Sequence, residues 1–107
     1  MANTLKILGQ AKSSGSYATA YIVPASTSAA VSGIVVCNTT IEKIVFSLYV
    51  VKSANLPDEY SLIYNNKEVL ACDTTILSAG PTMAAGDYVS IKAPVGVSIN
   101  VFGIEVT

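Results

Sequence analysis

Short runs in which apolar and polar residues alternate follow one another along the chain. In the run at 43–52, Ile44, Phe46 and Leu48 stand at every second position, with Val45 and Ser47 between them. Because a strand turns successive side chains to opposite faces, this spacing predicts a β-strand with one face on a core. No run in the sequence repeats with the 3.6-residue period of an amphipathic helix, so we expect at most one helical turn, near 66–71.

Turn-forming residues separate these runs at intervals of about 8–12 residues, which is typical of an all-β sandwich or barrel. The sequence predicts eight strands, near 4–10, 17–23, 29–37, 43–52, 60–64, 73–78, 87–92 and 97–106. Packing them into two sheets would bury the apolar positions and limit exposed edges. We therefore expect an all-β fold, an antiparallel β-sandwich of about eight strands that is jelly-roll-like, in a single domain covering 1–107.

The alternation also predicts which positions are buried. In the run at 29–37, Cys37 shares its face with Val31 and Val35 and is expected to be a buried small hydrophobe. Gly33, inside the same run, predicts a β-bulge or a close approach of another backbone. The run at 97–106 carries apolar residues in both registers, as a strand covered on two sides would. The core face of the run at 43–52 is expected to hold Ile44, Phe46, Leu48 and Val50.

The composition excludes several kinds of chemistry. The chain has no His, no Trp and no Arg. Without His, neither a Ser-His-Asp nor a Cys-His arrangement can be built, and without Arg there is no bidentate phosphate ligand. Asp58 and Glu59, the only adjacent carboxylates, are expected in a solvated turn, and Asp87 is expected to bond nearby backbone amides. We expect no enzyme activity, no catalytic residue, no cofactor and no metal site.

Charge is sparse and evenly spread. Charged residues make up 12% of the chain, the net charge is −1, and the six lysines form no run. This pattern excludes the basic patch of a nucleic-acid binder, and the apolar runs are too short to span a bilayer. The opening residues carry no secretion signal, so we expect synthesis in a cytoplasm and no membrane partner. Few charges on a small β domain favour a component of an assembly.

Cysteines and tyrosines each leave alternatives open. Cys37 and Cys72 are expected to be free thiols, with a disulfide formed after release, or a metal site, as alternatives. The tyrosines are expected to pack between strands, and a carbohydrate-binding platform is the alternative. The six are Tyr17, Tyr21, Tyr49, Tyr60, Tyr64 and Tyr88.

Five segments, spread in order along the chain, carry a family resemblance. They read MANTLKILGQ (1–10), YIVPA (21–25), SGIVVCNT (32–39), AAGDYV (84–89) and FGIEVT (102–107). Together they resemble the small virion structural proteins of tailed bacteriophages, cyanophages among them. The similarity runs along nearly the whole chain, but the stretch at 52–73 departs from it.

The resemblance implies a structural protein of the virion, assembled in the host cytoplasm. On that basis we expect a capsid decoration (cement) protein that forms a homo-oligomer, a homotrimer, and binds the major capsid protein. A tail or fibre accessory protein is the first alternative, and a surface carbohydrate-binding module is the second. The resemblance assigns no residue to partner binding.

Overall fold

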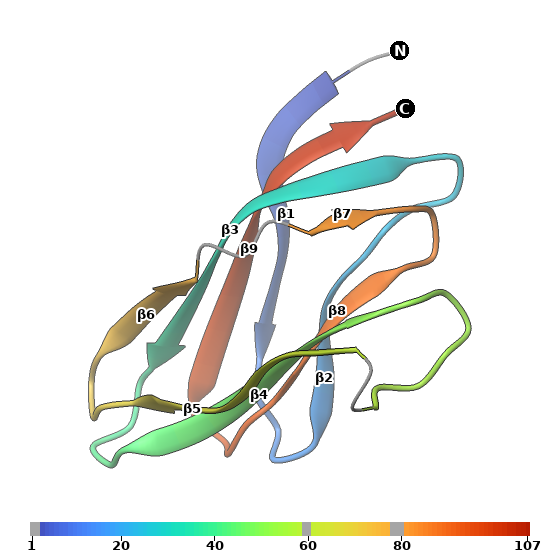
Figure 1. The fold of residues 1–107 in the computed structure, drawn as a ribbon. Helices are drawn as coiled ribbons and strands as arrows, with labels where there is room; N and C mark the ends of the chain where they lie inside the picture. Colours follow the sequence, from blue (N-terminus) through green and yellow to red (C-terminus); the bar gives the residue numbers. More distant parts are fainter. Residues whose placement is uncertain (1–2, 59–60, 78–80) are drawn as a thin grey trace.

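A computed structural model describes residues 3–58, 61–77 and 81–107. The described chain consists of β-strands joined by turns and loops, with no helix among those residues, and the strands form two layers (Figure 1). The strands are β1 (Asn3–Lys12), β2 (Tyr17–Ile22), β3 (Ser28–Asn38), β4 (Ile44–Val51), β5 (Leu62–Val69), β6 (Thr74–Leu77), β7 (Thr82–Met83), β8 (Tyr88–Lys92) and β9 (Val97–Val106). The predicted all-β fold is confirmed.

The order of the strands is that of a jelly roll. Sheet A has the order β1-β9-β3-β6, with the two-residue β7 also paired to β3, and sheet B has the order β2-β8-β4-β5. Every pairing is antiparallel. Leaving β7 aside, the first strand pairs with the last, the second with the last but one, and so on inward to β4 and β5. This nesting is the double-sheet arrangement that closes a jelly roll.

The core lies between the two sheets. Phe46 and Leu48 of β4 are 1% and 0% exposed, as the alternation predicted. They face Ile34 and Ile99 of sheet A, both fully buried members of the same apolar cluster. Burying a side chain of this size contributes about 1.5–3 kcal/mol, so this layer supplies much of the stability.

A β-bulge in β3 overturns part of the predicted core. The register of β3 against β9 shifts between Val31 and Gly33, which confirms the predicted bulge. There is no close approach, because a Cβ built on Gly33 would meet nothing within 4 Å. The extra residue reverses the alternation, so that Ile34 is buried while Val35 and Cys37 lie half-exposed on the outer face. The interpretation of Cys37 as a buried residue is therefore wrong.

At the end of β4, burial extends to the face opposite the core. Val50 packs against the core, as the alternation predicted, and Tyr49 and Val51 on the opposite face are also buried. The loop after β4 returns over this side of sheet B. Tyr88, the cross-strand partner of Val51, donates a hydrogen bond to the carbonyl oxygen of Asn55 at 2.7 Å. The outer face of a strand is thus buried by its own following loop.

One further expectation about elements was wrong. The sequence predicted a strand near 60–64, followed by at most one helical turn near 66–71. Instead β5 continues to Val69. Asn66 has a φ of +50° and sits where the register of β5 against β4 shifts, so the asparagines form a bulge inside a strand. The short strand β7 was not predicted.

The sandwich has two different ends. β1 and β9 pair along their whole lengths, so the two chain termini emerge side by side at one end (Figure 1). Four loops gather at the opposite end, and backbone hydrogen bonds join neighbouring members. They are the β1–β2 loop (13–16), the β3–β4 loop (39–43), the β5–β6 loop (70–73) and the β8–β9 loop (93–96).

Candidate functional site

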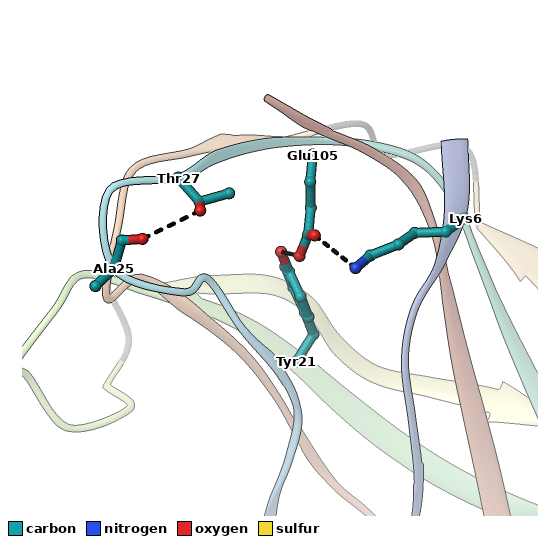
Figure 2. Close-up of polar contacts among 5 residues, drawn as sticks. All are labelled: Lys6, Tyr21, Ala25, Thr27 and Glu105. Atoms are coloured by element: carbon teal, nitrogen blue, oxygen red, sulfur yellow. Dashed lines mark hydrogen bonds and ion pairs between the residues drawn. The ribbon is translucent and has the colours of Figure 1, made fainter. Parts of the chain in front are cut away.

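A charged cluster lies between the two sheets, near the end of the sandwich where β1 begins and β9 ends. Glu105 of β9 accepts a hydrogen bond from the Tyr21 hydroxyl at 2.6 Å and forms an ion pair with the Lys6 ammonium, also at 2.6 Å (Figure 2). The Glu105 side chain is 11% exposed, and the Lys6 side chain is 44% exposed. The cluster therefore ties β1 and β9 of sheet A to β2 of sheet B.

The contacts of Glu105 fix its protonation state. The hydrogen bond from Lys6, followed by that from Tyr21, holds the pKa of Glu105 below its ordinary value although burial opposes this. Burial, reinforced by the neighbouring carboxylate, raises the pKa of Tyr21. At neutral pH Glu105 is thus ionised and Tyr21 is a hydrogen-bond donor. Both carboxylate oxygens are engaged, so the arrangement joins the two sheets.

Asn38, at the end of β3, organises the loop end. It is fully buried, and its amide nitrogen donates to the carbonyl oxygens of Glu42, Val69 and Leu70 at 2.7, 3.3 and 3.1 Å. Its amide oxygen accepts from the backbone nitrogen and the hydroxyl of Thr40, at 3.0 and 2.6 Å. One side chain therefore fastens the β3–β4 loop to the β5–β6 loop. The sequence indicated only a turn here, because an asparagine in a turn gives no sign of distant carbonyl partners.

The β8–β9 loop is attached to the same unit. Thr39 donates from its backbone nitrogen and from its hydroxyl to the carbonyl oxygen of Gly96, at 3.0 and 2.6 Å. Three exposed aliphatic side chains stand on the connected loops: Ile41 is 87% exposed, Leu70 is 60% exposed and Val95 is 70% exposed. We call these three residues the apolar loop tips. They are apolar groups held in water by ordered loops, which is typical of an interaction surface.

The outer face of sheet A carries exposed apolar side chains and is nearly free of charge. Ile7 lies opposite Phe102 across the β1–β9 pair, and Val35 lies opposite Ile76 across the β3–β6 pair. Ile7 is 53% exposed and Ile76 is 77% exposed, and no described strand packs over them. Along the described strands, Lys12 at one corner is the only charged residue that alternation places on this face.

The outer face of sheet B is more polar. It carries a concavity of about 380 Å³, and Val45, Ser47 and Tyr49 form part of its floor. Tyr17 meets Tyr49 edge-on with ring centroids 5.3 Å apart, and the Lys92 ammonium lies 5.3 Å from the Tyr17 ring. Because Tyr49 is buried, it offers no open ring face on which a sugar could stack.

The other residues singled out from the sequence lie apart from one another. Asp87 accepts from the backbone nitrogens of Ser53 and Ala84, both at 3.0 Å, which confirms its predicted turn role. Cys37 and Cys72 are both free thiols. Asp58 is in the loop after β4, while its neighbour Glu59 lies outside the described residues, as does Tyr60. Within the described chain, no three His, Cys, Asp or Glu side chains are grouped so as to hold a metal ion.

Comparison with known proteins finds no family model, no curated protein and no solved structure that matches this chain. Among the described residues there is no helix long and apolar enough to cross a membrane.

Proposed function

We propose that this protein is a non-enzymatic structural protein of a bacteriophage particle, a capsid decoration protein that oligomerises and stabilises the shell. The observation that carries the proposal is the set of apolar loop tips, Ile41, Leu70 and Val95, held outward at 60–87% exposure by the hydrogen bonds of Asn38 and Thr39. Loops already ordered before binding lose little conformational entropy on contact, so each buried side chain contributes more to affinity.

The fold and the resemblance supply the setting. Jelly rolls serve in viral capsid proteins and in lectins, so the fold suits both a particle component and a glycan binder without choosing between them. The phage setting comes from the sequence segments that resemble small virion proteins. Tyr49 is buried and the Lys92 ammonium lies over the Tyr17 ring, so these two tyrosines offer little open ring face to a glycan.

In this proposal the apolar loop tips contact the coat protein. A decoration protein that is itself oligomeric, as the expected homotrimer would be, presents several sets of tips at once. Its binding is then multivalent and outlasts that of a single chain. Bridging neighbouring coat subunits in this way would oppose their separation when the packaged genome presses outward.

The test uses particles produced without the protein. Purified wild-type chain added back to such particles should co-sediment with them and raise the temperature at which they release their genome. Leu70→Lys should lose this binding, because it places a charge in an apolar contact, while Ile63→Lys is the matched control on β5 at 45% exposure, away from the loop tips. Equal binding of the two variants would contradict the role of the tips. Binding to tails alone, seen by immunogold labelling, would replace the decoration role with the tail-accessory alternative.

A further inference from the structure

We infer that the outer face of sheet A is the surface through which copies of this chain associate, its occupant being the same face of a second copy. The inference deepens the proposed function, and rests on it for the oligomer that binds the particle. Three features of this face suit self-association: its composition, its shape and its area.

The composition suits contact between identical surfaces. Ile7, Phe102 and Ile104 form an apolar group across β1 and β9. Val35 and Ile76 form a second apolar pair across β3 and β6, level with Asn100 of β9. In a two-fold contact a charge is paired only where an opposite charge stands at the matching place on the same face, so a face with hardly any charge meets its copy with little desolvation cost. Lys12, at the corner next to the loop end, is the one charged residue on this face among the described strands.

The shape of the face offers a recess beside its largest side chain. Gly33 lies across from Phe102 in the β3–β9 pair, and the space where its side chain would stand is open. The φ of Gly33 is not positive, so no backbone constraint requires glycine here. Close by, Gln10 donates to Asn100 at 2.6 Å, so these two amides already satisfy part of each other's hydrogen bonding. A partner side chain can enter the recess at Gly33 and pack against the Phe102 ring.

The area reaches the minimum for a specific contact. Three strands of about ten residues and the four-residue β6, spaced about 4.8 Å apart at about 3.3 Å per residue, present roughly 550 Å². Two such faces would bury roughly 1,100 Å², which clears the minimum of about 1,000 Å² for a biological interface. The outer face of sheet B is less suited, because Lys92 stands beside Tyr17 and the loop after β4 covers its far side.

The experiment compares two isoleucines on opposite outer faces. Ile7 on sheet A is 53% exposed and Ile22 on sheet B is 57% exposed, so lysine at either position can reach water in a single chain. Sedimentation equilibrium should give a mass of two chains for the wild type, because a face that meets its own copy forms a two-fold dimer. Ile7→Lys should weaken association by at least about tenfold, the change that corresponds to 1.4 kcal/mol, whereas Ile22→Lys should not.

A second variant and a second readout keep the test decisive if Ile7→Lys folds poorly. Ile76→Lys changes a 77% exposed position on the same face and should also dissociate the oligomer. In the wild type, alkylation of Cys37, which lies on this face, should slow as protein concentration rises, with the exposed Cys72 as the internal reference. A monomeric wild type at every concentration, or equal dissociation of Ile7→Lys and Ile22→Lys, would overturn the inference.

The same variants separate this inference from the proposed function. A wild type that oligomerises through sheet A but does not bind particles would support the inference and overturn the decoration role. A monomeric wild type that binds particles and delays genome release would support the decoration role and overturn the inference.

Discussion

Glu105 shows how a single charged residue can be used inside an apolar sandwich. Its carboxylate is almost out of contact with water. Lys6 and Tyr21 each donate a hydrogen bond to it, with 2.6 Å between the donor and acceptor atoms. An unpaired carboxylate at this depth would destabilise the fold, so the cluster is stable only as a unit. The unit joins strands from both sheets, and its contribution depends on Glu105 being ionised.

We predict that Glu105→Gln lowers the free energy of unfolding by about 1.5–3 kcal/mol at neutral pH, the range for a hydrogen bond to a charged group. Because the folded-state pKa of Glu105 is lowered, its stabilisation is fully present above the unfolded-state value of about 4.3. That stabilisation is lost as the pH falls through the folded-state pKa. Urea denaturation of both proteins from neutral to acidic pH should therefore show the difference shrinking in acid.

Glu68→Gln is the matched control for this prediction. Glu68 also pairs with a lysine, Lys43, but at 3.8 Å and with both side chains more than half exposed. An exposed pair of this kind contributes about 0–1 kcal/mol, so this variant should stay close to the wild type. If Glu105→Gln were as mild as Glu68→Gln at neutral pH, the cluster would not join the sheets as described.

At the scale of elements, two glycines at β-bulges in sheet A have opposite surroundings. Gly9 in β1 lies at a register shift against β9, and a Cβ there would collide with the carbonyl oxygen of Ala20 in β2. Gly33 in β3 lies at a second register shift, with open space where its Cβ would be. Gly9 therefore allows β1 and β2 to close one side of the sandwich, whereas Gly33 shapes an outer face.

We predict that Gly9→Ala destabilises the protein by about 1–3 kcal/mol, the usual effect of forcing extra atoms into a packed site. Gly33→Ala should leave stability unchanged or raise it by about 0.5–1 kcal/mol, because alanine loses less backbone entropy in a strand. Thermal and urea denaturation of the two variants, each in dilute solution, tests the contrast. A reversed ranking would mean that β1 does not approach β2 at Gly9.

The same bulges explain what the sequence could and could not predict. Alternation alone predicted the sandwich and the burial of Phe46 and Leu48, because a period of two survives wherever a strand is regular. It failed after Ser32 in β3 and at Asn66 in β5, because one extra residue reverses every later position. The cluster around Glu105 and the network of Asn38 could not be predicted, since their partners are brought together only by the order of strands.

At the scale of the whole molecule, three surfaces differ in their polarity. The outer face of sheet A carries exposed apolar side chains, that of sheet B carries Lys92 and its tyrosines, and one end carries the apolar loop tips. Two apolar surfaces at roughly right angles allow a chain to contact its own copies with one and another protein with the other. In a closed oligomer each copy then adds one contact with the other protein, while the contact between copies stays the same.

We predict that self-association is nearly independent of salt. Because apolar burial and not ion pairing would hold the copies together, the dissociation constant should stay within about threefold between 0.1 and 1 M NaCl, while the screening length falls from about 10 to 3 Å. Sedimentation equilibrium across this range measures it. A steep loss of association with added salt would show that charged residues form the contact, and not the outer face of sheet A.

The position of β9 has a consequence for how the protein is made. β9 lies between β1 and β3, so the strand at the middle of sheet A is translated after every other strand of this domain. Until Val97–Val106 has left the ribosome, β1 and β3 share no common neighbour and their facing edges stay unpaired. Such a nascent chain exposes strand edges and apolar surface to proteases and chaperones. A chain truncated before Val97 therefore cannot complete sheet A, and the facing edges of β1 and β3 stay open in it.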